Sequence, residues 1–207
     1  MNIIKGIVFL LKNFLFALRK LYLDLFFVPF DPNKPLPEGA IFKLYEIISI
    51  LNKLKIAYFI TDGTILGLYR DKNLIPHDND IDIALIDNKK LILLILSLIK
   101  SGWFPMRLLI KDFHIYQLIF HKDMVILDFL NWKQNSNNIT FLCPEVNGIR
   151  RQDMKFYKPT SFLLDGRNYL SHSNLEEWLK IHYGENWNIP KSYKGDWREE
   201  TKDIIKD

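Results

Sequence analysis

Three aspartates stand in segments whose other residues are mostly apolar. Asp80 and Asp82 alternate with isoleucines, and Asp128 interrupts the apolar run over residues 125–130. Alternate residues of a strand share one face, so Asp80 and Asp82 point the same way. Two carboxylates about 7 Å apart stay ionised where divalent cations lie between them, and a charge in an apolar strand costs several kcal/mol unless it is paired or coordinated. Three such acids on adjacent strands predict a two-metal site for phosphoryl chemistry.

A structural explanation of these acids stays open at this point. Acidic pairs often lie on a solvated strand edge, and Asp128 could pair with a lysine or an arginine. The preceding turn favours chemistry, because Asp62-Gly63-Thr64 follows a short apolar strand and opens a helix. Free backbone N–H groups and a hydroxyl are then offered to an anion. A phosphate cradle and a cation platform in one short segment are hard to attribute to packing.

The elements that must position these residues follow from the apolar spacing. In chain order we expect a helix over 37–55, a strand over 56–60, a short helix over 65–69, a strand over 81–86, a helix over 89–100, two strands over 113–120 and 124–130 that form a hairpin, and a helix over 174–183 capped by Gly184. Beyond Trp132 the chain is polar and rich in turn residues. This order predicts an α/β (α+β) fold, a mixed β-sheet with helices on at least one face.

Length and composition limit the class of protein. The 207 residues are 48% hydrophobic and 25% charged, which suits one domain with a core and a short appendage. A single cysteine, Cys143, excludes a disulfide framework and a cysteine-based zinc site. A formal net charge of +4 does not imply a nucleic-acid partner, but it allows an acidic membrane surface.

Residues 1–30 are apolar but do not form one uninterrupted run. A membrane span needs about 20 consecutive apolar residues, and polar side chains interrupt this segment at Lys5, Lys12, Asn13, Arg19, Lys20 and Asp24. On a helix these residues fall on one side, which is nearly all basic. The pattern predicts an amphipathic helix lying in a membrane interface on anionic headgroups. Packing on the protein itself or on a partner chain, and a true span, are the alternatives. We place a linker over 31–39.

The central motif resembles a known family. The segment Asp62-Gly-Thr-Ile-Leu-Gly-Leu-Tyr-Arg70, with Ile75-Pro-His-Asp-Asn-Asp-Ile-Asp82 after it, is similar to the LicD/fukutin-type family of the nucleotidyltransferase fold. That family usually shows a Gly-Thr-Leu-Leu-Gly turn, an arginine, and then Ile-Pro with acids ending in Asp-x-Asp. The tail over 178–190 resembles the family's closing Tyr-Gly-x-x-Trp-x-x-Pro segment. His77 stands where a tryptophan is common, and Asn79 replaces one acid.

The resemblance implies a nucleotidyltransferase-like catalytic domain over 40–207, with a C-terminal substrate-binding tail. Its implied activity moves a phosphorylated alcohol, phosphocholine or a polyol phosphate, from a CDP-linked donor to a sugar hydroxyl of a cell-surface or lipid-linked glycan, with release of CMP. Asp80, Asp82 and Asp128 would hold Mg²⁺, or else Mn²⁺, and Asp128 would accept the proton of the attacking hydroxyl. The glycan would be a lipopolysaccharide or a capsule, and the enzyme would lie peripherally on the inner, cytoplasmic face of the cell membrane.

Six further residues are expected to bind substrate, each with a structural alternative. Asp62, Gly63 and Thr64 would cradle phosphate, Arg70 would grip the diphosphate, His77 would contact the donor or a metal, and Trp187 would stack on the base or the sugar. Arg70 could equally be a surface arginine, His77 a loop contact, and Trp187 part of the packing of the tail. The remaining histidines, His114, His121, His172 and His182, are expected to be structural or exposed.

Two other functions fit the same residues. One is nucleotidyl transfer, in which NMP moves from an NTP to a small molecule through the same three acids. The other is a catalytically silent scaffold for glycan assembly, which the retention of all three acids disfavours. A basic cluster formed by Arg150, Arg151, Lys155 and Lys158 could bind phosphate or headgroups, although a solvated face explains it more simply.

Overall fold

The computed structural model describes most of the chain beyond residue 33. The described residues are 34–86, 89–111, 114–135, 138–145, 148–155, 159–191 and 204–205, together with Leu10, Asn13, Phe14 and Ala17. The amphipathic helix predicted over 1–30 and the first part of the linker fall almost wholly outside them, so both stay predictions. In the part that is described, no helix is both long and apolar enough to cross a bilayer.

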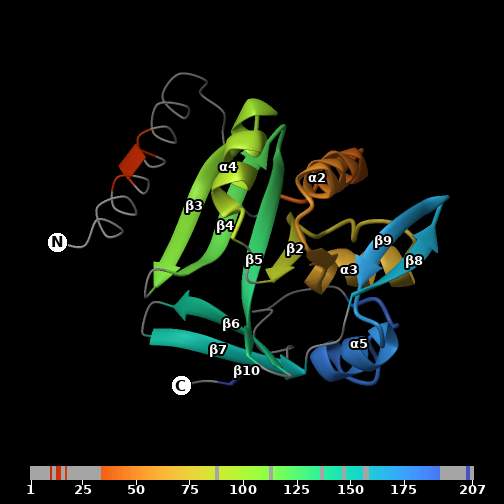
Figure 1. The fold of residues 1–207 in the computed structure, drawn as a ribbon. Coiled ribbons are helices and arrows are strands. Elements are labelled where there is room, and N and C mark those ends of the chain that lie inside the picture. Colours follow the sequence, from red (N-terminus) through yellow and green to blue (C-terminus); the bar gives the residue numbers. More distant parts are fainter. Residues whose placement is uncertain are drawn as a thin grey trace.

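A mixed sheet forms the centre of the molecule (Figure 1). Its strands are β1 (Tyr58–Ile60), β2 (Asp80–Ile86), β3 (Phe104–Lys111), β4 (His114–Lys122), β5 (Val125–Asn135), β6 (Asn138–Glu145), β7 (Gly148–Lys155) and β10 (Ile204–Ile205). The path β1-β2-β5-β6-β7-β10 runs through the sheet, and β4 joins β3 to β5. The pair of β2 and β5 is parallel, whereas the other pairs described in this sheet are antiparallel. The predicted mixed sheet is therefore confirmed.

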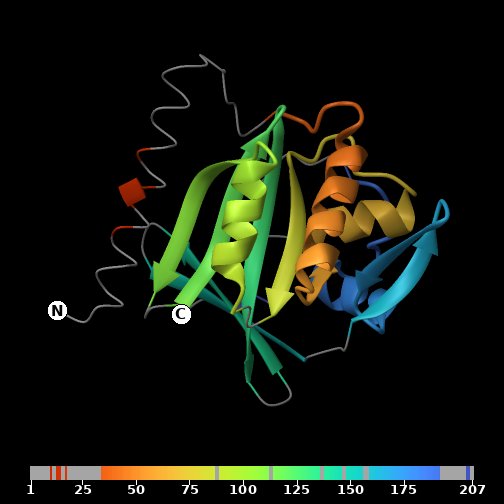
Figure 2. The same ribbon diagram turned by 45° about the horizontal axis from the view of Figure 1, so that its top comes forward.

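Helices and a separate hairpin complete the fold. They are α2 (Ala40–Leu54), α3 (Asp62–Arg70), α4 (Leu91–Lys100) and α5 (Leu175–Tyr183), with the hairpin of β8 (Thr160–Leu164) and β9 (Arg167–Ser171). Figure 2 shows α2 and α4 side by side over one face of the sheet, and the two helices are in contact. The β8-β9 hairpin and α5 lie beside α3 (Figure 1).

The core lies between the sheet and the α2-α4 layer. Apolar residues at helical spacing bury one side of each helix, including Leu44, Ile47 and Leu51 of α2. Burial alternates over the first four residues of β2, because Ile81 and Ile83 are fully buried whereas Asp80 and Asp82 are half-buried. The same strand therefore supplies the core on one face and carboxylates on the other.

The predicted elements are present, with shifted ends. The short helix begins at Asp62, three residues earlier than expected, and β4 and β5 form the predicted hairpin. The stretch after Trp132, which we expected to be polar and rich in turns, instead contains β6 to β9. β6 buries Ile139 and Phe141, two residues apart, and pairs with β7 along its length, so strands form in a stretch whose overall polarity did not indicate them.

Strand β3 was not predicted, for a different reason. Its pairing with β4 shifts register twice, between Pro105 and Arg107 and again between Leu109 and Ile110. The first shift leaves Met106 of β3 as the extra residue, so the side chains after it change face and the period-two pattern that identifies strands is interrupted; in the second shift the extra residue is Tyr116 of β4.

Candidate active site

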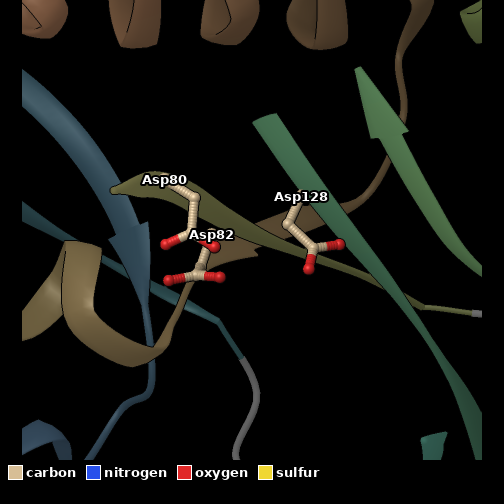
Figure 3. A group of neighbouring side chains, drawn as sticks. All are labelled: Asp80, Asp82 and Asp128. Carbon is tan, nitrogen blue, oxygen red and sulfur yellow. The ribbon is translucent and has the colours of Figure 1, made fainter. Parts of the chain in front are cut away.

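The three predicted acids lie together on two neighbouring strands. Asp82 of β2 is the direct register partner of Asp128 of β5, and Asp80 lies two residues before Asp82 on the same face. Figure 3 shows the three side chains directed toward one region. One carboxylate oxygen from each residue lies within 4.8 Å of the others. The parallel register of β2 on β5 thus assembles the triad that the sequence predicted.

Burial makes this cluster electrostatically unfavourable without a counter-charge. Burial, and then the charges of Asp78 and Asp128, raise the pKa of Asp80 well above its usual range. Burial, and then the charge of Asp80, do the same to the pKa of Asp82. Burial raises the pKa of Asp128 to about 7, opposed by a hydrogen bond from Gln117. Of the residues that the structure describes, none forms an ion pair with these three acids.

The oxygens of Asp128 fit a cation site. Gln117 Nε2 donates a hydrogen bond of 2.6 Å to Asp128 Oδ2, and both residues are buried. Asp128 Oδ1 is buried with no hydrogen-bond partner. A buried carboxylate oxygen beside two further carboxylates is the hard oxygen donor set that Mg²⁺ and Mn²⁺ accept. The triad therefore suits a divalent cation, which would supply the missing positive charge.

Asp62 faces the same cluster from the start of α3. Its backbone has a φ of 49°, in the left-handed region that aspartate adopts less often than glycine or asparagine. After burial, the charge of Asp62 is among the causes that raise the pKa of each triad acid. Its Oδ1 lies 3.0 Å from Nε2 of His182 on α5. The structure thus brings Asp62 to the triad and fixes it from the C-terminal tail.

The contact with His182 was missed from the sequence, where this histidine was expected to be structural or exposed. The His182 ring is buried and stacks on Trp178, with centroids 4.8 Å apart and planes 15° apart. Both residues belong to the tail segment over 178–190. The resemblance of this segment to the family's closing segment was the available signal. It gave the tail a role in substrate binding, which the spacing of the histidines did not indicate.

Gly63 and Thr64 join the start of α3 to the acids. Gly63 lies so close to the Asp78 carboxylate that a Cβ atom there would overlap Oδ2, so this contact requires glycine. The buried Thr64 Oγ1 accepts a hydrogen bond of 2.8 Å from the backbone N–H of Asp82. The hydroxyl predicted to cradle phosphate is already bonded to the strand that carries the triad, and its phosphate contact stays a prediction.

Arg70 and Trp187 lie away from the triad. Arg70 is at the other end of α3, about 12 Å along the helix from Asp62. Its guanidinium makes two hydrogen bonds to Asp71, of 2.8 and 2.7 Å, and a third of 3.5 Å to the carbonyl of Trp187. The Trp187 ring lies 5.8 Å from the Tyr69 ring. These contacts attach the tail to α3, and the Arg70 side chain is only 11% exposed, so it is not the surface arginine of the structural alternative. The substrate contacts of both residues stay predictions.

His77 and the basic cluster complete the candidates. His77 is exposed in the loop before β2, and its charge is one of the causes that oppose the raised pKa of the buried Asp78 carboxyl, so it lies near the acids. The side chains of Arg150, Arg151 and Lys155, and all of Lys158, lie outside the described residues. A phosphate or headgroup contact by that cluster stays a prediction.

Comparisons with known proteins agree with the motif. The family model described as "LicD/FKTN/FKRP, nucleotidyltransferase domain" matches residues 55–175, more than half of the chain. A curated relative, ribitol-5-phosphate transferase FKTN of Macaca fascicularis, is 25% identical over 158 residues, which are 74% of this chain and 34% of the relative. The chain thus spans about a third of the length of that relative.

Solved structures of ANT(2'')-Ia are also similar. The crystal structure of its complex with adenylyl-2''-tobramycin matches at 14% identity with a TM-score of 0.44, covering 64% of this chain and 68% of that one. The solution structure of this antibiotic-resistance factor matches at 13% identity with a TM-score of 0.46, covering 67% of each chain. The match of the family model over residues 55–175, which include the whole triad, shows that the chain belongs to the LicD/FKTN/FKRP family.

Proposed function

We propose that this protein transfers a phosphorylated alcohol from a CDP-linked donor to a sugar hydroxyl, with release of CMP. The observation that carries the proposal is the triad, in which two half-buried carboxylates of β2 and the buried carboxylate of Asp128 on β5 converge beside the start of α3. Membership of a family that includes a protein named as a ribitol-5-phosphate transferase supports a transferase of this kind. The acceptor would be a cell-surface or lipid-linked glycan.

Asp80, Asp82 and Asp128 would hold Mg²⁺, with Mn²⁺ as the alternative. When bound, the cation would neutralise the negative charge of the donor diphosphate and of the departing CMP. The start of α3 would help to orient the donor, because its first backbone N–H groups have no partner within the helix. Asp62, at the first position of that helix and paired with His182, would belong with Gly63 and Thr64 to the part of the site that holds the donor phosphates.

The acceptor hydroxyl oxygen would attack the phosphorus atom that carries the alcohol. The bond from that phosphorus to the oxygen it shares with the CMP portion would break, and CMP would leave with the electron pair. Asp128 would accept the hydroxyl proton, because its Oδ1 is buried with no hydrogen-bond partner and could take the proton. Gln117 would keep the Asp128 carboxylate in place through its bond to Oδ2.

The test is CMP release from CDP-choline, CDP-ribitol, CDP-glycerol and CDP-ethanolamine, with and without Mg²⁺. Asp82→Asn should lower the release at least about a hundredfold, because it removes one of three converging charges from a buried site. Asp165→Asn is the matched control: Asp165 is exposed in the turn between β8 and β9 at a φ of 49°, which asparagine also tolerates. Equal loss in both variants, or full release by Asp82→Asn, would contradict the proposal.

Nucleotidyl transfer is the second candidate, because the matching family model describes a nucleotidyltransferase domain. The same three acids would serve that reaction, and the products distinguish the two: CMP from a CDP-alcohol, pyrophosphate from an NTP. A silent scaffold would release neither product, and cells carrying Asp82→Asn would keep their glycan modification.

The proposed location follows from the sequence of the amino-terminal segment. Residues 1–30 would hold the enzyme peripherally on the inner, cytoplasmic face of the cell membrane, through an apolar side and a basic side. A lipid-linked acceptor confined to the same surface would reach the enzyme at a higher local concentration.

A further inference from the structure

The outer side of α4 is apolar although it faces away from the sheet. Leu91, Leu94, Ile95 and Leu98 are buried against the core. On the opposite side Ile92, Leu93 and Leu96 remain 57%, 53% and 57% exposed. Residues 92, 93, 96 and 100 follow the three- and four-residue spacing of one helix face, so exposed Lys100 continues this side at its C-terminal end, and exposed Lys89 lies two residues before the helix begins. We call these five residues the α4 face.

Positive charge surrounds the α4 face. Lys90 Nζ donates hydrogen bonds of 2.8 and 3.2 Å to the carbonyls of Leu54 and Lys55, which brings the end of α2 to the start of α4. Lys53 and Lys55 are exposed there. The two helices lie side by side in Figure 2. The sequence has no acidic residue from position 88 to position 111.

We propose that the α4 face docks on an anionic lipid bilayer. Aliphatic side chains in the middle of a helix face enter the boundary between headgroups and acyl chains, while lysines at its ends and beside it meet the lipid phosphates. Ile92, Leu93 and Leu96 supply the aliphatic part, and the five surrounding lysines, Lys53, Lys55, Lys89, Lys90 and Lys100, supply the charge. This surface is separate from residues 1–30 and independent of the proposed reaction.

Charge complementarity favours lipid over two other occupants. The amino-terminal segment carries lysine or arginine at positions 5, 12, 19 and 20 and a single acid at position 24, so it offers little negative charge to the lysines around the α4 face. A second copy would pack the same face against itself. Because lysines lie at both ends of the apolar strip, lysine would meet lysine whether the two helices ran parallel or antiparallel.

The test is co-sedimentation of the full chain with phosphatidylcholine vesicles that contain or lack phosphatidylglycerol. Leu93→Ser with Leu96→Ser should lower partitioning onto the anionic vesicles about tenfold, because two aliphatic anchors become polar. Lys89→Gln with Lys100→Gln should lower it roughly fivefold for each lysine. The matched controls should bind like the parent: Leu163→Ser removes a leucine that is 70% exposed on β8, and Lys180→Gln removes an exposed lysine on α5.

The outcomes separate this surface from the others. Unchanged partitioning of both α4 double variants would overturn the proposal, since residues 1–30 would then account for all binding. A dimer of the parent protein that becomes a monomer in Leu93→Ser with Leu96→Ser, measured by light scattering without lipid, would assign the face to a second copy. Neither donor nor acceptor is present in these measurements, so their failure would leave the proposed transfer reaction standing.

Discussion

The triad and the α4 face are both exceptions to the usual distribution of residues, and in opposite directions. At the triad, Asp80, Asp82 and Asp128 lie in the sheet with no cationic side chain bound to them among the described residues. On α4, leucine and isoleucine are exposed on a helix that already buries a full apolar side. Burying like charges and exposing contiguous apolar groups both cost free energy in the isolated chain.

The difference shows which kind of partner each region lacks. At the triad a divalent cation removes the repulsion between carboxylates, which no rearrangement of the apolar neighbours could do. At the α4 face the missing partner must be apolar in the middle and anionic at the rim, because that is the complement of leucines flanked by lysines. We therefore expect the triad to make stability depend strongly on cation and pH, and the α4 face to contribute almost nothing to that dependence.

The largest expected effect is a loss of stability at high pH in the absence of cation. The folded-state pKa of Asp128 is about 7, above its ordinary value of 3.8, and the pKa values of Asp80 and Asp82 are raised in the same direction. Between pH 3.8 and about pH 7, the folded state therefore holds protons that the unfolded chain has released. The free energy of unfolding should therefore fall as the pH rises from about 4 to about 7, by several kcal/mol.

Thermal unfolding in a chelator at pH 5 and pH 8, with and without added Mg²⁺, measures this effect. Added Mg²⁺ should raise the melting temperature more at pH 8 than at pH 5, because the ligands are then ionised. Asp128→Asn should be more stable than the parent at pH 8 without cation, and should lose most of the Mg²⁺ effect. A parent protein that grows more stable from pH 5 to pH 8 in chelator would contradict this electrostatic description of the site.

The next effect, smaller than that of the triad itself, concerns the residue that supports Asp128. Gln117→Leu removes the donor of the 2.6 Å hydrogen bond to Asp128 Oδ2, and that bond opposes the raised pKa of Asp128. The affinity for Mn²⁺ should fall about 10- to 100-fold, as for other residues that orient metal ligands. The loss should be greater at pH 6.5 than at pH 8.5, because more Asp128 is then protonated.

Calorimetric titration with Mn²⁺ checks this result. Gln134→Leu is a suitable control, because Gln134 is an exposed amide on β5, the strand that carries Asp128. Equal affinity in Gln117→Leu and the parent would show that Gln117 only fills space beside the carboxylate.

The triad could be predicted from the sequence because its signals are local. Asp80 and Asp82 show the period of a strand, and Asp128 is conspicuous because its neighbours in the strand are apolar. Gln117 carried a weaker signal of the same kind, a single amide in the apolar run over 115–120, and was missed. The register that sets Asp82 opposite Asp128 joins residues far apart in the chain, so no local pattern encodes it.

The tail and the outer strands could be predicted less well. His182 reaches Asp62 across 120 positions of sequence, a contact that only the folded arrangement of α5 beside α3 creates. The bulged β3 and the largely backbone-paired β7 lack a regular alternation of apolar residues. The helix over 89–100 was predicted from its apolar composition, but that composition does not distinguish the buried side of α4 from the exposed side.

The smallest expected effect is a substitution on the α4 face in the absence of lipid. Leu93 and Leu94 are neighbours on one helix with the same side chain, yet Leu93 is half-exposed whereas Leu94 is fully buried. Leu94→Ala should lower the free energy of unfolding by about 2–5 kcal/mol, because it leaves a cavity. Leu93→Ala should change it by less than about 0.5 kcal/mol, because water already contacts that side chain.

Urea unfolding of the full chain measures both variants. If Leu93→Ala were destabilising by as much as Leu94→Ala, some part of the protein would already cover the α4 face, and a bilayer could not dock there. If Leu93→Ala is neutral in solution but binds anionic vesicles less tightly, the exposed leucine contributes only when the membrane is present. The exposed apolar residues of the α4 face, which do not stabilise the fold, are then explained by the bilayer that they contact, as the triad is explained by its cation.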